Sequence, residues 1–520
     1  MMPRAHRPTA GLNLPLSALY SQNSWGIGEI PDISKLAHKL HELVGGLRVL
    51  QLLPLTPMSL GCNSPYSSCS SFGIDPIYLS VPAACETLAE IVHSQFEFET
   101  PEPSVPERVA FAEVRKTKLK ALRRICEPHL THPRLQATLN EFSSQQPWVN
   151  DFALFQALTH VHANAWWKWP TGLRSRDSEA LANFRVQHRQ HVDFFCLLQW
   201  LCMNQWAQMR RELQQLGMTL MGDLPFMVAE HSFDVWAYSS CFDRSRSLGV
   251  PGDAFDADGQ DWTLPAYRWD ALEASNYAWI RRRVAHMAGL FDRLRVDHAV
   301  GLFRTYSREC SKISATGLPP GSFSPDAAPA QQRQGHQVFS ILAEVAEENA
   351  CSLIAEDLGV IPEYVAPVLA ALGLPGYRVI PWERTGTGLT DPRRFPTSSV
   401  ACFGTHDTPP LAGWWEAQPV KAREEVLALA GASQLAGDAP WGAPVHQLLL
   451  DLVFGASSEL AMIILPDLFA SSQRLNTPGT IGEHNWTYRL PCPIESLAND
   501  PQRAAAIDRV RSSIEACGRA

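Results

Sequence analysis

The 520-residue sequence has no uninterrupted run of about 18 apolar residues, the length that a membrane-spanning helix needs. Its N-terminal stretch carries some positive charge, but the apolar part is short and is broken by Pro15. A signal peptide needs a longer apolar segment. We therefore expect a cytoplasmic location and no association with a membrane.

The sequence also lacks a strong excess of charge of one sign. It has 44 Lys and Arg against 53 Asp and Glu, which gives a net charge of −9. A protein that binds nucleic acid or an anionic membrane surface usually carries a basic patch. We therefore expect no nucleic-acid partner.

Metal-binding patterns are absent as well. The 12 cysteines form no CxxC pair, and no histidine stands at zinc-ligand spacing from them, so we interpret them as reduced thiols. The acidic stretch 252–262 lacks the spacing and the closing Glu of a calcium loop. We expect no metal and no cofactor.

Short apolar runs rich in Val, Leu or Ile are present instead, and they are typical of buried parallel strands. Most follow an amphipathic helical stretch, of which 195–216 is the clearest. Helix and strand in repeated alternation indicate the α/β class, and we predict one catalytic (β/α)8 barrel over residues 1–520. The predicted strands lie in 47–55, 218–226, 291–303, 352–360, 377–382 and 400–407.

Two stretches are too long for simple connections within a barrel. Residues of approximately 85–200 are mainly helical in pattern and predict an inserted subdomain. Residues of approximately 227–275 are rich in Gly, Pro and Asp, and we expect an irregular insertion with a loop over the active site. A third stretch, 311–334, is low in apolar residues and is expected to be looser.

A carboxylate closes several of the predicted strands. Any one of them has an alternative interpretation, because an Asp at a strand end often caps a helix or forms a turn. Four together indicate a site, because barrel enzymes place their active sites at the C-terminal strand ends. The four are Asp223, Asp297, Glu356 and Asp407.

The segment RLRVDHAVG places Arg295 and Asp297 on one face of a strand, because side chains alternate. An arginine neighbour favours the ionised carboxylate, which suits a nucleophile toward an anomeric carbon; the alternative is a structural ion pair. Glu356 and Asp357 point to opposite sides, and the pattern does not say which faces the barrel mouth. Either one, buried near another anion, meets the needs of a general acid.

Polar and aromatic side chains complete the pattern of a sugar site. Asp407 follows His406 in the sequence. Asp407, His406 and His298 are all suited to hydrogen bonds with sugar hydroxyls. The 16 tryptophans include several in loop-like segments, where aromatic rings can bind sugar faces, although core filling is the alternative. Together these features predict an enzyme that makes and breaks bonds between sugars.

Motifs along nearly the whole chain resemble those of the 4-α-glucanotransferases (amylomaltases, or disproportionating enzymes) of glycoside hydrolase family 77. They include SPYSSCSSFGIDPIYL (64–79), MGDLPFMVAEHSFDVWA (221–237), RVDHAVGLF (295–303), IAEDLGVI (354–361), THDTPPLAGWW (405–415) and RLNTPGTIGEHNWTYR (474–489). The resemblance implies that α-1,4-glucan segments are transferred by a retaining double displacement. Donors and acceptors would be maltooligosaccharides, amylose and glucose, and the protein would be a monomer or homodimer.

The resemblance also implies roles for individual residues. Asp297 matches the nucleophile, Glu356 rather than Asp357 the general acid/base, and Asp407 the transition-state stabiliser. The residues implied in substrate binding are Arg295, His298, His406, Asp223, Tyr66, Phe255, Trp262 and Asn476.

The sequence departs from the family pattern in the loop over the site, where Ala254-Phe255 stands in place of a frequent Tyr-Phe pair. Two other functions are alternatives to glucan transfer. An amylase-type α-glucan hydrolase would use the same three carboxylates, whereas a catalytically silent glucan-binding protein would have no need of them.

Overall fold

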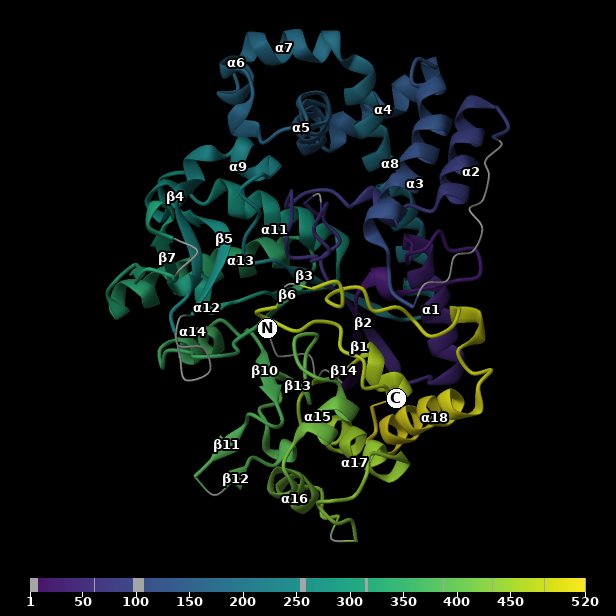
Figure 1. Cartoon of the computed structure of the whole chain (residues 1–520), viewed down its shortest axis with the longest axis vertical. Helices are drawn as coiled ribbons and strands as arrows, with labels where there is room; N and C mark the ends of the chain where they lie inside the picture. The colour runs from purple at the N-terminus through teal and green to yellow at the C-terminus, as the bar shows by residue number, and fades with distance from the viewer. Residues whose placement is uncertain are drawn as a thin grey trace.

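Eight parallel strands close into a barrel in the computed structural model, which describes residues 8–519 except 60, 97–106, 253–258, 314–316, 387, 433 and 481. Around the barrel the order is β1-β14-β13-β10-β9-β6-β3-β2 (Figure 1). This arrangement confirms the predicted (β/α)8 fold. The strands are β1 (Thr9–Leu14), β2 (Leu47–Leu52), β3 (Thr219–Leu224), β6 (Arg293–Val296), β9 (Ser352–Ala355), β10 (Gly376–Val379), β13 (Ser399–Cys402) and β14 (Leu460–Ile464).

Two barrel strands were not predicted from the sequence. β1 has the sequence TAGLNL, in which Gly11 and Asn13 interrupt an already short apolar pattern. β14 is wholly apolar and is followed by Leu465 and Pro466 before the first carboxylate, Asp467. The two strands pair with each other in parallel, with Leu12 opposite Ile463, and so close the barrel.

Helices cover the outside of the barrel. α1 (Ile30–Leu43) begins where the Glu29 backbone N–H donates to Asp32 Oδ2 at 2.9 Å, a bond that satisfies a helix-end donor. Its buried side chains recur at helical spacing and face the strands. The other helices of this layer are α8 (Arg189–Gln215), α11 (Ala278–Leu290), α13 (Ala328–Glu348), α14 (Val365–Ala371), α17 (Ala443–Phe454) and α18 (Pro501–Ala516).

Helices also fill the long connection between β2 and β3, and they form the upper part of Figure 1. The longest of them, α8, is tied to the loop after β2 by Gln199, which donates to the Ile74 carbonyl and accepts from its N–H, each at 3.0 Å. The remaining helices of this part are α2 (Val81–Val92), α3 (Phe111–Cys126), α4 (Pro133–Gln145), α5 (Trp148–His162), α6 (Thr171–Arg174) and α7 (Ser178–Gln187).

A small antiparallel sheet lies beside the barrel in the order β5-β4-β7-β8. Its strands β4 (Phe242–Val250) and β5 (Gln260–Tyr267) occupy much of the stretch 227–275, for which we expected an irregular course. β7 (Thr305–Glu309) and β8 (Ser322–Ser324) come from the connection after β6. Ala254 and Phe255, between β4 and β5, lie outside the described residues.

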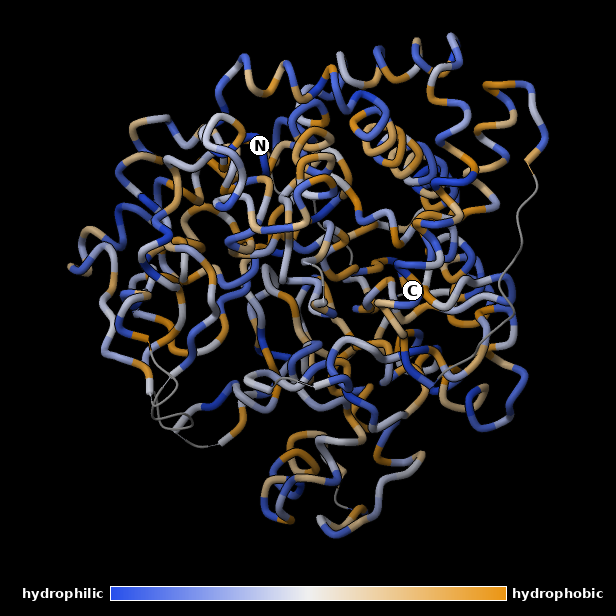
Figure 2. Tube along the Cα trace, turned by 45° about the horizontal axis from the view of Figure 1, so that its top comes forward, coloured by the Kyte–Doolittle hydropathy of each residue, from blue (hydrophilic) through white to orange (hydrophobic). Residues whose placement is uncertain are grey.

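The elements that remain are short. They are α9 (Phe233–Ala237), α10 (Trp269–Ala274), α12 (Val300–Phe303), α15 (Leu411–Ala417), α16 (Val420–Leu429) and the hairpin of β11 (Arg384–Thr385) and β12 (Gly388–Leu389). Hydrophobic segments gather toward the middle of the molecule, and hydrophilic ones are frequent at its outer turns (Figure 2). Among the described helices, none has the length and apolarity to cross a membrane. All 12 cysteines are unpaired.

Candidate active site

A cavity of about 530 Å³ opens at the C-terminal ends of the barrel strands. Asp297 follows β6, Glu356 follows β9, and Asp407 comes five residues after the end of β13. The three carboxylates therefore meet at one end of the barrel although they are distant in sequence. The cavity is lined by them and by Arg295, His298, Tyr66, Phe226, Trp262, Asn476, Trp486 and neighbouring residues.

Arg295, in β6, connects the carboxylates. Its guanidinium Nη1 lies 2.7 Å from Asp223 Oδ2 and 2.9 Å from Asp297 Oδ1, and its Nη2 lies 3.7 Å from Glu356 Oε2. The guanidinium is only 3% exposed. A buried cation that contacts three carboxylates fixes their positions and offsets their mutual repulsion.

Glu356 faces the cavity, and its neighbour Asp357 does not. Glu356 Oε2 accepts a hydrogen bond of 2.6 Å from the His298 backbone N–H, whereas Asp357 Oδ1 accepts one of 2.7 Å from the Tyr377 N–H in β10. Burial and the nearby Asp297 raise the pKa of Glu356 to about 8, against the opposing charge of Arg295. Glu356 is therefore protonated at neutral pH.

Asp407 has the opposite protonation state. Burial alone would raise its pKa, but His406 and the hydrogen bond from Asn476 Nδ2 to Asp407 Oδ1, 2.6 Å long, hold the pKa below its ordinary value. The Arg474 guanidinium donates to the Asp407 carbonyl at 2.7 Å and fixes the backbone. The cavity thus contains one protonated and one ionised carboxyl at neutral pH.

Tyr66, from the loop after β2, links the two sides of the site. Its hydroxyl donates to Asp223 Oδ2 at 2.9 Å and lies 3.0 Å from His406 Nε2, and His406 Nε2 is 3.3 Å from Asp407 Oδ2. Asp223 and His406 are almost fully buried beside the cavity, so that in this structure they hold Arg295, Tyr66 and Asp407 in place.

Aromatic rings also line the cavity. His298 has a left-handed backbone, with φ of 45°, and its ring packs edge-on against the rings of Phe226 and Trp262, at centroid distances of 5.2 Å and 5.1 Å. Burial lowers the pKa of His298, so its imidazole is neutral at neutral pH. Trp486 stands 5.7 Å from the Tyr66 ring.

Phe226 and Trp486 line the cavity but were not predicted as site residues from the sequence. Phe226 lies inside the motif 221–237 and Trp486 inside the motif 474–489, both of which carry the family resemblance. Membership in these motifs was the sequence feature that could have identified them as site residues. Of the residues predicted to bind substrate, Phe255 lies outside the described residues. In the part of the chain that the structure describes, no three His, Cys, Asp or Glu side chains are grouped as metal ligands.

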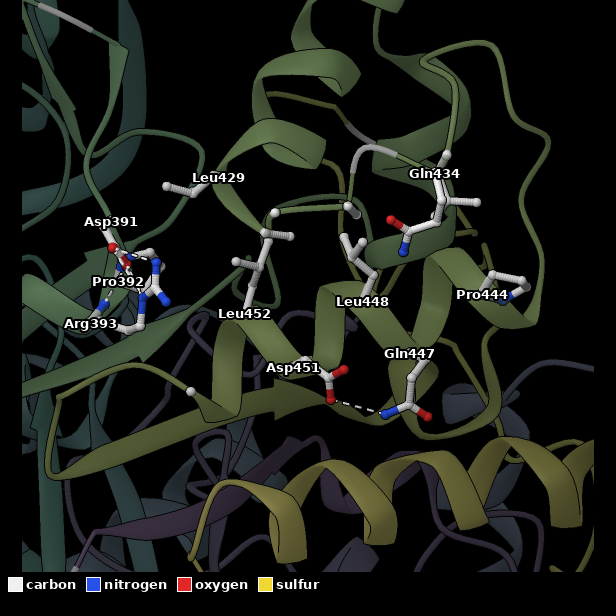
Figure 3. Close-up of a pocket in the computed structure, with 15 residues that line it drawn as sticks. Asp391, Pro392, Arg393, Leu429, Gln434, Pro444, Gln447, Leu448, Asp451 and Leu452 are labelled. Carbon is white, nitrogen blue, oxygen red and sulfur yellow. Dashed lines mark hydrogen bonds and ion pairs between the residues drawn. The ribbon is translucent and has the colours of Figure 1, made fainter.

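A second cavity, of about 420 Å³, lies beside α17 and the segment before β13 (Figure 3). Its charged groups already have partners. Asp391 binds the Arg393 guanidinium at 2.8 Å, and Asp451 accepts a 3.0 Å hydrogen bond from Gln447 Nε2. It has no facing carboxylates comparable to those at the C-terminal end.

A (β/α)8 barrel with an acid and carboxylates together in one open, aromatic-lined cavity is typical of enzymes that act on glycosidic bonds. Residues 14–495 match the family model described as 4-alpha-glucanotransferase, and the chain belongs to this family. The predicted family is thereby confirmed, and transfer is favoured over hydrolysis of the amylase type.

Individual relatives agree along nearly their whole length. The 4-alpha-glucanotransferase of Chlamydia muridarum is 30% identical, with 94% of this chain and 93% of the relative covered. That of Thermus thermophilus is also 30% identical, with 90% and 92% covered. The solved amylomaltase from Streptococcus agalactiae in complex with acarbose has the same fold, with a TM-score of 0.82 at 24% identity over 98% of this chain and 99% of that one.

Proposed function

We propose that this enzyme transfers α-1,4-glucan segments by a double displacement in which Asp297 is the nucleophile and Glu356 the general acid and base. The observation that carries the proposal is that two carboxyls in one cavity differ in their protonation and in their partners. Glu356 is protonated at neutral pH, whereas Asp297 Oδ1 lies 2.9 Å from the Arg295 guanidinium as a paired carboxylate. An acid and a nucleophile are the two groups that a retaining mechanism requires.

In the first half of the reaction, an Asp297 oxygen attacks C1 of the bound glucose unit. The bond from C1 to the leaving oxygen breaks as the Glu356 proton passes to that oxygen. The reducing-end fragment leaves with a free 4-OH, and the donor glucan is held as an ester on Asp297. Arg295 and the Phe226 N–H, 3.2 Å from Asp297 Oδ2, orient the attacking carboxylate.

In the second half, Glu356, now ionised, removes the proton from the 4-OH of an acceptor glucan. The acceptor oxygen attacks C1, and Asp297 leaves as a carboxylate. Two inversions at C1 retain the α configuration. The donors and acceptors we propose are maltooligosaccharides, amylose and, as an acceptor, glucose.

Asp407 and the residues around it stabilise the positive charge that develops at the sugar. Its carboxylate stays ionised because His406 and Asn476 hold its pKa down. A fixed anion near the ring stabilises the oxocarbenium-like state more than the ground state. We propose that His298, Tyr66 and Trp262 contact the bound glucan, and that Asp223 holds Arg295.

Incubation with maltotriose tests the proposed function. Transfer yields glucose together with longer oligomers, whereas glucose and maltose without longer products would contradict it.

The nucleophile is tested with Asp297→Gly in the presence of azide, which fits the space of the lost carboxylate. A glucosyl azide of β configuration is expected, because only one inversion then occurs; its absence together with near-wild-type turnover would refute the assignment of Asp297.

We also propose that residues 1–520 act as one catalytic unit in the cytoplasm, where the 12 unpaired cysteines remain reduced. The proposed state is a monomer or a homodimer, and light scattering coupled to size-exclusion chromatography distinguishes the two.

A further inference from the structure

A pocket of about 540 Å³ lies apart from the catalytic cavity, and none of the mechanism above uses it. It is formed where the first turn of α5, the residue after α9, the middle of α11 and the loop after β2 meet. Its volume is close to the 530 Å³ of the catalytic cavity. A pocket of this size accommodates a small ligand of one to three sugar units, roughly 300–1,000 Å³ being usual for ligand sites.

Aromatic rings supply much of its wall. Trp148 is half-buried and stacks near Phe72, with centroids 6.1 Å apart and planes at 22°. Phe233 stands edge-on to Phe72 at 6.0 Å, and Tyr238 edge-on to Phe233 at 6.3 Å. Gly73 has φ of +80°, and a Cβ there would contact Trp148 Cζ3 at 3.4 Å, so the loop packs closely on the tryptophan. Phe72 and Phe233 are buried, at 2% and 1% exposure, so the half-buried Trp148 and Tyr238 are the rings whose faces a ligand can reach.

Polar groups stand among these rings. Gln146 Oε1 accepts from the Trp148 indole N–H at 3.0 Å, which leaves the amide NH₂ of Gln146 as a donor. His286 Nε2 accepts from the Gly73 N–H at 3.3 Å, and burial lowers the pKa of His286 to about 4. The neutral ring therefore carries its hydrogen on Nδ1, which is a second donor. Asp151, with a side chain 41% exposed, supplies acceptor oxygens.

The charges in the pocket are balanced. The lining contains one acidic and one basic side chain, Asp151 and Arg282. Asp151 Oδ2 also binds Arg176 Nη2, from outside the lining, at 2.6 Å, and the Arg282 guanidinium lies 3.5 Å from the Tyr238 hydroxyl. The lining thus favours neither an anion nor a cation. Flat apolar faces combined with dispersed donors and acceptors match a neutral ligand that has both C–H faces and hydroxyl edges.

We propose that this pocket is an accessory binding site for an α-1,4-glucan. The choice of glucan rests on the proposed function, since it is the neutral polyhydroxylated molecule that the catalytic cavity takes. The pocket and the catalytic cavity share the loop after β2. Tyr66 lies in the catalytic cavity, and Phe72, six residues later, lines the pocket. A long glucan held in the pocket remains near the site where its ends react, which raises the effective substrate concentration.

Calorimetric titration with maltotetraose tests the proposal on the full-length Asp297→Asn protein, which binds without turnover. Two binding sites are expected. Tyr238→Ala in the same background should weaken one of them about tenfold, the range for truncation of an aromatic anchor. Ala285→Phe, on the α11 wall of the pocket, should abolish the same site by filling it without removing an existing contact. Arg281→Ala, one residue from the pocket residue Arg282, is the matched control and should leave both sites unchanged.

A single site in Asp297→Asn, or two sites that Tyr238→Ala and Ala285→Phe leave intact, overturns the proposal. A further result is expected for the Ala285→Phe enzyme with an intact Asp297. Its KM for long amylose should rise about threefold or more while kcat/KM for maltotriose stays at the wild-type value, because a trisaccharide does not span both sites. Failure of the wild type to lengthen maltotriose would refute the proposed function, whereas the number of binding sites decides the accessory pocket.

Discussion

Residue environments, more than residue types, separate the roles of the carboxyls. Glu356 and Asp407 line one cavity, yet the pKa of the first is raised to about 8 and that of the second is lowered. Burial raises both. The difference comes from the partners, because Asp407 is bound by Asn476 and lies beside His406, whereas the charge nearest to Glu356 after Arg295 is another carboxylate, Asp297. Environments that push the pKa values of two carboxyls apart are typical of active sites in which one group acts as the acid and the other stays ionised.

The raised pKa of Glu356 predicts an alkaline limit to activity. For the proposed mechanism, kcat/KM with maltotriose should fall about tenfold per pH unit above pH 8, because the leaving oxygen then lacks its proton donor. The measurement is the initial rate of glucose release at low maltotriose concentration from pH 5 to 10. Glu356→Gln should lose this limb along with most of its activity. A limb centred near pH 5 would show that another group is the acid.

The same raised pKa predicts that Glu356→Gln, which loses activity, gains stability at alkaline pH. Because the folded-state pKa of about 8 exceeds the unfolded value of 4.5, ionisation of Glu356 destabilises the fold as pH rises from 4.5 to 8. Glu356→Gln should therefore be more stable than the wild type at pH 8, by an amount on the order of a few kcal/mol.

At pH 4 the two proteins should unfold at the same denaturant concentration, since the carboxyl is protonated in both the folded and the unfolded state. Urea unfolding at pH 4, 6 and 8 measures the difference, and Glu363→Gln, at an exposed position, is the control. A stability difference that is independent of pH would argue against a raised pKa at Glu356.

The positions of Asp297, Glu356 and Asp407 at strand ends predict from the sequence alone that they share one rim, and the cavity contains all three. The same pattern does not choose between Glu356 and Asp357, because alternation gives opposite faces without saying which face is inside. The structure shows why Asp357 turns away, since it accepts the Tyr377 N–H of the neighbouring strand. Such pairings depend on the register between strands, which one strand's sequence does not contain.

At the level of elements, the apolar pattern predicted six of the eight barrel strands. β1 was missed because Gly11 and Asn13 interrupt its pattern, and β14 because a short, wholly apolar run does not by itself distinguish a buried strand from a buried helix. Their pairing is between the two ends of the chain, so only the closure of the barrel reveals it. β4 and β5 escaped prediction because Gly and Asp, which disfavour strands, are frequent there.

Helix packing gives a prediction in which two similar substitutions have opposite signs. A Cβ at Gly335 in α13 would lie 1.9 Å from Phe303 Cδ1, whereas one at Gly289 in α11 would meet no atom within 4 Å. Gly335→Ala should therefore destabilise the protein by about 1–3 kcal/mol through overpacking. Gly289→Ala should stabilise it by up to about 1 kcal/mol, because alanine loses less backbone entropy. Thermal unfolding of both variants measures these changes in stability. A change of the same sign in both variants would contradict the packing described for α11 and α13.

For the whole molecule, the position of the extra elements explains how one end of the barrel became the reactive one. The helices α2–α7 and the sheet β5-β4-β7-β8 are all built on connections that leave C-terminal strand ends. The sheet contributes Trp262 to the lining of the cavity, and Tyr66, Phe226 and Trp486 add aromatic side chains from outside the helices and strands, whereas the second cavity is lined by Asp391, Arg393, Asp451, two glutamines and aliphatic groups (Figure 3). Transfer to a sugar rather than to water requires such a wall, because water is far more concentrated than any acceptor.

Trp262 in β5 is the residue of that sheet whose loss should most directly weaken the preference for transfer over hydrolysis. It lines the cavity, and its ring centroid lies 5.1 Å from that of His298. Trp262→Ala should increase the ratio of hydrolysis to transfer about tenfold, which corresponds to roughly 1.4 kcal/mol of lost acceptor binding. With maltotriose, new reducing ends report hydrolysis, and longer oligomers report transfer. Trp441→Ala, near α17 and away from the cavity, should leave the ratio at the wild-type value. If Trp262→Ala lowers both reactions equally, the tryptophan binds donor and acceptor states alike, and the exclusion of water depends on other parts of the wall.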